Sequence, residues 1–179
     1  TRMVIKESFI NLLEKKDISQ ITIKEICENA DINRATFYAH YSDQYDLLRK
    51  IEDEFLDNIR NYINELDQKK YKDNPVLLAE KVFGYIKENA KLCKLLLSER
   101  GGLNFQKRVM ILLYDTIIDE LTGKSRISRE DAEYAYSYTI TGCIGIVQKW
   151  IDDGMKKSAR FMAEMVINLT LGLINALKK

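Results

Sequence analysis

The sequence contains very few of the residues that interrupt helices: one proline and eight glycines among 179 residues. Proline lacks the backbone donor that a helix needs, and glycine weakens a helix interior. Leucine, isoleucine, lysine and glutamate are abundant, and 46% of the residues are hydrophobic, so a substantial core can be buried. This composition predicts an almost entirely helical protein.

The sequence is also poor in residues that bind metals or form disulfides. Its three cysteines, Cys27, Cys93 and Cys143, lie far apart, and its only histidine is His40. Without a Cys-x-x-Cys pair, neither a zinc site nor a disulfide framework is indicated, and we expect reduced, mostly buried thiols. A glycine-rich phosphate loop and a recognisable catalytic constellation are missing too. We therefore expect no enzyme, no cofactor and no metal.

A charge excess of either sign is absent, with 28 basic against 27 acidic residues. Residues 1–50 are equally balanced, with eight of each, although a nucleic-acid-binding domain often has a basic excess. We find no uncharged apolar run of about 18 residues and no signal peptide, and so expect a cytoplasmic protein without a membrane span. The chain begins at Thr1 rather than Met, which leaves room for a short preceding segment that could be basic.

Apolar residues at helical spacing, separated by caps and breaks, predict about nine helices. We expect them near 3–13, 23–29, 33–41, 43–66, 76–90, 92–99, 103–121, 129–152 and 159–177. The polar stretch 69–75 is the clearest connection, and Pro75 suits the first turn of a new helix. Residues 168–177 are almost uncharged, which predicts a helix buried on more than one side. We expect an N-terminal three-helix domain over residues 1–48 and a larger helical bundle over 49–179.

The N-terminal segment contains a helix-turn-helix pattern. Thr22 and Glu25 form a capping box that begins a short helix, and Asn33 is a good N-cap for the next one. Between them, Asp31 lies in a tight turn that suits Asn or Asp. Two short helices joined by a three- to four-residue turn are typical of the helix-turn-helix, whose second helix enters the major groove of DNA.

The second of these helices has side chains suited to DNA. Phe37 and Tyr41 lie one turn apart and can anchor it on the small core. Arg34 could donate to guanine or phosphate; Thr36, Tyr38 and His40 could donate to phosphates; Ala35 and Ala39 could lie against a thymine methyl. An aromatic-rich helix can also be plain core of an ordinary bundle, but the surrounding pattern favours DNA binding.

The run from Thr22 to Leu48 resembles the DNA-binding domain of the TetR/AcrR family, and the match covers about residues 1–50. The resemblance implies that Thr22, Thr36, Tyr38 and His40 hold phosphates, while Lys24, Arg34, Ala35 and Ala39 meet bases. Two positions depart from the family pattern. Asp31 replaces the usual glycine of the turn, and Gln44 replaces a phosphate-binding lysine; a glutamine can still donate a hydrogen bond but has no charge.

The run 142–155 is similar to a subgroup of this family that includes activators of dihydroxyacetone kinase genes. In the wider family the last two long helices pair with their twins in a homodimer. The candidate interface residues are Gly142, Gly145, Ile146, Met165, Leu169 and Leu173. The candidates for an effector pocket are Phe83, Ile86, Phe105, Tyr114, Tyr138 and Trp150. At helical spacing such residues are more often simple core, and Trp150 can also belong to the interface.

The resemblance implies a ligand-responsive repressor that binds a palindromic operator in double-stranded DNA as a homodimer. A small-molecule effector would bind the larger domain, the helix at 43–66 would swing, and the spacing of the two recognition helices would change. The alternative is a transcriptional co-activator, related to the dihydroxyacetone kinase regulators, that acts through a protein partner.

Overall fold

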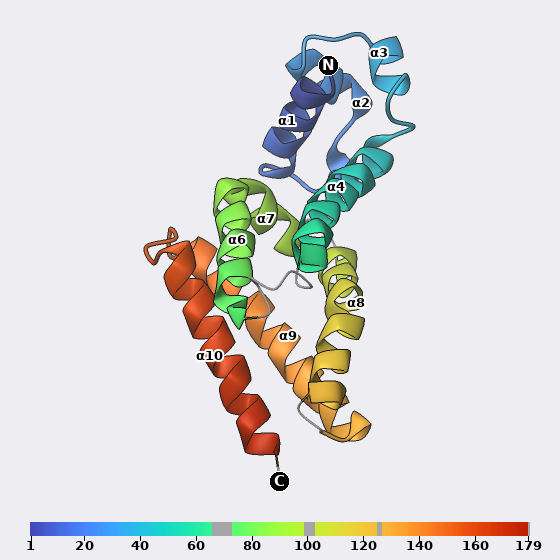
Figure 1. Ribbon diagram of the computed structural model, residues 1–179. Helices are drawn as coiled ribbons and strands as arrows, with labels where there is room; N and C mark the ends of the chain where they lie inside the picture. The colour runs from blue at the N-terminus through green and yellow to red at the C-terminus, as the bar shows by residue number, and fades with distance from the viewer. Residues whose placement is uncertain (66–72, 99–102, 125–126, 179) are drawn as a thin grey trace. The chain divides into compact units, whose positions relative to one another are not determined.

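The computed structural model describes residues 1–65, 73–98, 103–124 and 127–178, which form nine α-helices and no strand (Figure 1). The helices are α1 (Arg2–Leu13), α2 (Ile23–Asn29), α3 (Arg34–Tyr38), α4 (Gln44–Asn64), α6 (Pro75–Glu88), α7 (Ala90–Leu97), α8 (Leu103–Asp119), α9 (Arg129–Asp152) and α10 (Ala159–Leu177). The predicted all-α fold is confirmed. Most of the polar connection predicted at 69–75 lies outside the described residues, but Pro75 begins α6 as expected.

The chain forms two compact units. The first comprises Thr1–Asp57 with Lys91–Phe105, and the second comprises Asn58–Ala90 with Gln106–Lys179. The boundary predicted after residue 48 falls inside α4, and this helix runs on to Asn64. Helix α4 therefore contributes residues to both units.

The first unit is built around a small aromatic and aliphatic core. Phe9 of α1, Ile26 of α2, Phe37 of α3 and Leu47 of α4 are each fully buried. The buried Ser8 hydroxyl donates to the Ile26 carbonyl at 2.9 Å, which satisfies a polar group at the contact of α1 and α2. These four helices share one core, so α3 is held rigidly by its neighbours.

The second unit places α10 along α6 and α9 (Figure 1). The rings of Phe83 and Trp150 pack edge to face with centroids 5.5 Å apart. The Trp150 indole donates to the Lys157 carbonyl at 3.0 Å, which ties the end of α9 to the turn before α10. Gly154 and Met155 have positive φ in that turn, so the break predicted there is confirmed.

Helix α10 differs from the expectation that it is buried on more than one side. Leu169 is 59% exposed and Leu171 is 48% exposed, and Asn168 and Gly172 are also exposed. The prediction was wrong for the single chain because the apolar surface of α10 exceeds what α6 and α9 cover. Helix α10 is also long and apolar enough to cross a membrane, whereas no such helix was expected from the sequence. Of its most apolar 18-residue stretch, 17% is buried in the structure.

Candidate nucleic-acid interface

The predicted capping box begins α2. The Thr22 hydroxyl accepts from the Glu25 backbone N–H at 3.3 Å, and the Glu25 carboxylate accepts from the Thr22 backbone N–H at 3.0 Å. Hydrogen bonds from Lys16 and from Thr22 lower the pKa of Glu25 to about 2. The carboxylate is therefore ionised at neutral pH. The Thr22 hydroxyl also donates to it at 2.8 Å, so a phosphate at Thr22 would compete with that bond.

The turn between the two short helices depends on Asp31. This residue has φ of 50°, in the left-handed region, which aspartate tolerates better than most residues. The Ile32 backbone N–H then donates to the Cys27 carbonyl at 3.0 Å, which closes the end of α2. The turn expected from the sequence forms without glycine.

Helix α3 presents one buried face and one exposed face. The Asn33 side chain caps it, because its Oδ1 accepts from the Thr36 backbone N–H at 2.8 Å. Phe37 is 0% exposed, and Tyr41, one turn on, is also buried. The opposite face is open to solvent, with Tyr38 55% exposed. The predicted contact residues lie as follows: Arg34, Ala35, Tyr38 and Ala39 are exposed on or just after α3, Thr22 and Lys24 are exposed at the start of α2, and Thr36, His40 and Gln44 are half-buried.

The connection from α3 to α4 is fixed by Asp46. Its buried carboxylate accepts from the Ser42 backbone N–H at 3.1 Å, from Arg49 at 2.8 Å and from Lys50 at 3.0 Å. These bonds, that from Arg49 first, hold the pKa of Asp46 well below its usual range. Lys50 in turn donates to the His40 carbonyl at 2.9 Å. The position of His40 is thereby tied to the first turns of α4.

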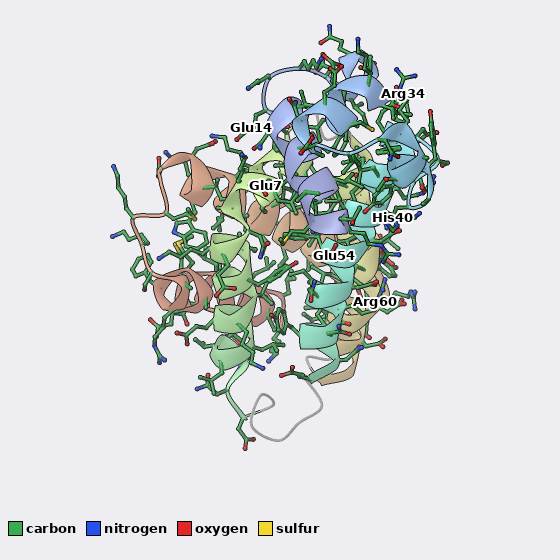
Figure 2. The ribbon with its side chains drawn as sticks, turned by 90° about the horizontal axis from the view of Figure 1, so that it is seen from above. Glu7, Glu14, Arg34, His40, Glu54 and Arg60 are labelled. Carbon is green, nitrogen blue, oxygen red and sulfur yellow. The ribbon has the colours of Figure 1, made fainter. Side chains whose placement is uncertain are left out.

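The charges of the first unit are not evenly distributed. Several acidic side chains of the neutral N-terminal segment are paired, as in Lys24–Glu28 at 3.7 Å and the contact of Lys16 with Glu25. Arg34 and His40 lie along one side of the unit, while Glu7 and Glu14 lie across it on α1 (Figure 2). An exposed pair such as Lys24–Glu28 is weak and opens easily to an incoming phosphate.

Sequence reasoning missed a basic groove beside this face. Arg2 and Lys6 of α1 line it together with His40 and Lys50, and its volume is about 460 Å³. No pattern in the sequence signals it, because the groove arises from packing between helices far apart in the chain.

The six candidates for an effector pocket do not meet in one place. Phe83, Ile86 and Trp150 are buried within the second unit, and Tyr114 there donates to Glu133 and packs on Tyr136. Phe105 instead belongs to the first unit, where its ring contacts Phe55 with centroids 5.7 Å apart. Tyr138 is 73% exposed, so it does not line an interior site. Periodicity indicated apolar faces but not which neighbour covers them.

The six candidate interface residues all lie along one face of α9 and α10. Gly142, Ile146, Leu169 and Leu173 line a groove of about 260 Å³, together with Tyr138. A second groove, of about 640 Å³, shares Gly142 and Ile146 and adds Gly145 and Met165. A Cβ built on either glycine would meet nothing within 4 Å in this chain. The face is therefore open at both glycines; its first groove is mostly apolar, and its second groove also contains Lys149, Asp153, Lys156 and Lys157.

The cysteines are free, with Cys27 and Cys93 buried and Cys143 half-buried, as expected. Across residues 1–65, 73–98, 103–124 and 127–178, no group of three His, Cys, Asp or Glu side chains is placed to hold a metal ion.

A capped helix-turn-helix with an exposed second helix, followed by a larger helical unit, defines a helix-turn-helix DNA-binding protein. A family model described as the C-terminal region of transcriptional regulators, of the TetR type, matches residues 73–172. The chain therefore belongs to the TetR family of transcriptional regulators. The independent N-terminal resemblance and this C-terminal match together account for most of the chain.

Individual relatives agree with this assignment. An uncharacterized HTH-type transcriptional regulator, YxbF of Bacillus subtilis (strain 168), is 36% identical over 47 residues, which are 26% of this chain but only 12% of that protein. The dihydroxyacetone kinase operon activator DhaS shares the fold, with a TM-score of 0.65, 23% identity and coverage of 99% of this chain and 98% of that one. A TetR-family regulator from Syntrophomonas wolfei has a TM-score of 0.71 at 17% identity, covering 97% and 94%.

Proposed function

We propose that this protein is a cytoplasmic, ligand-responsive repressor that binds a palindromic operator as a homodimer, with α3 as its recognition helix. The observation that carries the proposal is the division of α3 into a buried anchor, Phe37, and an exposed face that presents Arg34, Ala35 and Tyr38. The Tyr38 ring meets only the edge of Phe37 among the described aromatic residues and leaves 55% of the residue exposed, so its hydroxyl is available to a partner outside the chain. Small residues on the same face let a helix lie deep in the major groove.

The contacts divide by chemistry. Arg34 and Ala35, in the first turn of α3, are suited to base edges, because the N-terminal residues of a recognition helix enter the groove. Tyr38 and His40 follow at the end of the helix and are suited to phosphates, which position the protein without specifying sequence. Gln44 would donate an uncharged hydrogen bond there.

The DNA contact is tested by titrating labelled duplex with Tyr38→Ala and Tyr38→Phe variants. The duplex is one that the wild type has enriched from a randomised pool. We expect the alanine variant to lose about ten-fold or more in affinity, since it removes a hydroxyl donor and its ring, while keeping its unfolding curve. The phenylalanine variant keeps the edge contact with Phe37 and should fall in between. Equal affinity in all three proteins would contradict the proposal.

The apolar α9–α10 face supports the homodimer. A soluble monomer rarely leaves a contiguous apolar surface of this kind open, and the exposed Gly142 and Gly145 permit close helix approach. A two-fold dimer also presents two recognition helices to the two halves of a palindrome. An alternative is that α10 crosses a membrane, since its length and composition would suffice. A protein that stays in solution without detergent would exclude this alternative.

Two leucines of α10 provide a matched pair for testing this. Leu169 lines the groove, whereas Leu171, also exposed, lies two residues on and so points to another side of the helix. In light scattering coupled to gel filtration, Leu169→Glu should give a monomer near 20.9 kDa, because it buries a charge in the interface, and Leu171→Glu should stay dimeric. A monomeric wild type, or two dimeric variants, would refute this interface.

The effector would bind within the second unit, which contains the buried apolar side chains Phe83, Ile86 and Trp150. It regulates DNA binding only if it prefers the state that does not bind DNA. Because Trp150 is the only tryptophan, its fluorescence reports ligand entry directly. A true effector should change this emission and weaken DNA binding by some factor. DNA should then weaken binding of the effector by the same factor.

One observation favours a second function, that of a co-activator working through a protein partner. Gln44 begins α4 without the positive charge that the family uses there, and residues 1–50 have no net charge. If this chain alone has a low affinity for DNA, it would need a protein partner to bind its target. Footprinting separates the two: protection of a palindrome by this chain alone supports the repressor, and protection only with a partner supports the co-activator.

A further inference from the structure

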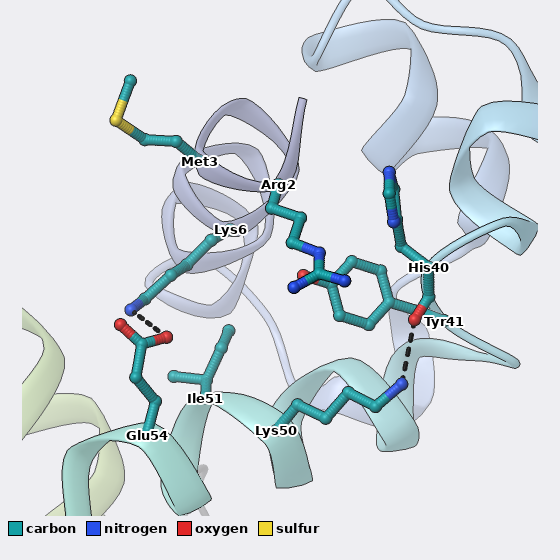
Figure 3. A pocket seen from close by; sticks show the side chains of 8 residues that line it. All are labelled: Arg2, Met3, Lys6, His40, Tyr41, Lys50, Ile51 and Glu54. Carbon is teal, nitrogen blue, oxygen red and sulfur yellow. Dashed lines mark hydrogen bonds and ion pairs between the residues drawn. The ribbon is translucent and has the colours of Figure 1, made fainter.

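A groove in the first unit has walls from three different segments. It is lined by Arg2, Met3, Lys6, His40, Tyr41, Lys50, Ile51 and Glu54 (Figure 3). We call it the α1–α4 groove. The first turns of α1 form one side, the residues after α3 form another, and α4 forms the floor. Basic side chains outnumber acidic ones in this lining, although residues 1–50 as a whole are neutral.

Two of the basic residues brace the groove. Lys6 reaches Glu54 at 3.0 Å, which joins α1 to α4. Lys50 donates to the His40 carbonyl at 2.9 Å, pairs with Asp46 at 3.0 Å and lies over the Tyr41 ring, 5.2 Å from its centroid. These contacts use the charges of Lys6 and Lys50 to hold the walls in place.

The other two donors, Arg2 and His40, are not used in this way. Neither side chain makes a hydrogen bond or ion pair with another residue in the part of the chain that the structure describes. Figure 3 shows the Arg2 guanidinium beside the Tyr41 ring, with the His40 imidazole on the other side. Burial raises the pKa of Tyr41, and the Arg2 charge acts against that shift. A guanidinium and an imidazole thus both line a groove whose walls are held by Lys6 and Lys50.

We propose that the α1–α4 groove is a phosphate site, and that Arg2 contacts a backbone phosphate of the DNA flanking the bases read by α3. The inference rests on the proposed function and extends it to a residue outside the helix-turn-helix. The guanidinium presents a planar fork of donors that matches two oxygens of a phosphate. His40 follows Tyr38 by two residues, so the groove adjoins the exposed end of α3. Lys50 acts as a positioning residue, since it holds the His40 backbone.

The salt dependence of DNA binding measures this contact without knowledge of the operator. Each phosphate neutralised contributes about −0.9 to the slope of log affinity against log salt on duplex DNA. Arg2→Ala should therefore reduce the slope by about 0.9 for each protomer on the DNA, and by about 1.8 for a dimer. At 0.1 M salt, loss of one such contact lowers affinity about eight-fold, since 0.1 raised to the power 0.9 is about one eighth.

Lys15→Ala is the matched control. Lys15 is exposed and lies just past the other end of α1, about 18 Å from Arg2 along a 12-residue helix at the usual rise. The Lys15→Ala variant loses one positive charge from the same unit, as Arg2→Ala does, but should keep the wild-type salt slope. Arg2→Lys should largely keep the wild-type slope as well. If wild type and Lys15→Ala bind with a steep slope and Arg2→Ala shares it, the site is refuted while the proposed function stands.

A second arm separates DNA phosphate from free phosphate. Because His40 is the only histidine, its imidazole NMR signals report the groove without ambiguity. We expect millimolar inorganic phosphate, at constant ionic strength, to shift these signals in the wild type and not in Arg2→Ala, and duplex DNA to abolish the effect. If no protein binds duplex, the proposed function fails, yet a phosphate shift that needs Arg2 still supports the site as one for free phosphate. Signals that phosphate leaves unmoved in the wild type would overturn it.

Discussion

Removal of the Asp46 carboxylate should loosen the connection between α3 and α4. This side chain is 8% exposed and accepts hydrogen bonds from the Ser42 backbone N–H, Arg49 and Lys50. Asp46→Ala leaves the Ser42 N–H without its acceptor and frees Lys50 from one of its anchors. Asp46→Asn keeps an acceptor for Ser42 but removes the charge.

The expected magnitude follows from the exposure of each partner. The bond from a backbone N–H to a buried carboxylate is the largest contribution, at about 1.5 kcal/mol. Arg49 and Lys50 are more than half exposed, so each of their ion pairs adds only about 0.3 kcal/mol. We therefore expect Asp46→Ala to lower the free energy of unfolding by about 2 kcal/mol and Asp46→Asn to lower it by about 1 kcal/mol.

The loss should also depend on pH. The pKa of Asp46 is lower in the folded than in the unfolded protein, so the folded state favours the ionised carboxylate. Its contribution is present above the unfolded pKa of about 3.9 and disappears as the pH falls through the lower folded value. The stability gap between wild type and Asp46→Asn should thus be full at pH 7 and narrow steadily below about pH 4.

Urea unfolding followed by far-ultraviolet circular dichroism, at pH 7 and pH 3, measures both effects. The slope of the transition must stay the same for the comparison to hold. A gap of the same size at both pH values would show that the charge of Asp46 is not what stabilises the turn. Wild-type stability in Asp46→Ala at pH 7 would refute the reasoning altogether.

Three further predictions concern buried or strained positions of the first unit. Asp31→Gly should hold or raise stability by about 0.5 kcal/mol, while Asp31→Val should lose more than about 1 kcal/mol, because a branched residue resists positive φ; equal urea midpoints would contradict this. Phe37→Ala should cost about 3–5 kcal/mol, as expected for a fully buried phenylalanine, and a loss under about 1 kcal/mol would show that α3 is not anchored there. Burial raises the pKa of Cys93 to about 12, so at pH 8 it should react with a thiol reagent far more slowly in the folded protein than in the urea-unfolded protein; rapid labelling of Cys93 in the folded protein would count against this burial.

Local structure in the DNA-binding segment could be predicted from sequence because its determinants are local. The capping box of Thr22 and Glu25 involves residues three apart, and the Asn33 cap does too. The left-handed turn depends on Asp31 alone. Each of these features therefore appears in the structure where the pattern indicated it.

Tertiary features could not be predicted in the same way. Arg2 and His40 line one groove although 38 positions separate them, and helical spacing indicates nothing about such a meeting. Tyr138 fits an apolar helical pattern, yet it is exposed beside Gly142. The uncharged end of α10 was expected to be buried on more than one side, but within one chain Ile174 alone of residues 168–177 is buried. A pattern indicates which side chains are apolar, and not whether the same chain or another molecule covers them.

If the exposed face of α3 enters duplex DNA, a single negative charge placed on that face should weaken the complex. Ala35→Glu puts a carboxylate where the major groove would lie, while Asn11→Asp adds the same charge to the α1 face that holds Glu7 and Glu14, across the unit from Arg34 (Figure 2). Both positions are exposed, so neither change should unfold the protein. In a titration of the selected duplex, Ala35→Glu should lose on the order of 100-fold in affinity, and Asn11→Asp should stay within about three-fold of wild type. Equal affinity of Ala35→Glu and wild type would contradict the account.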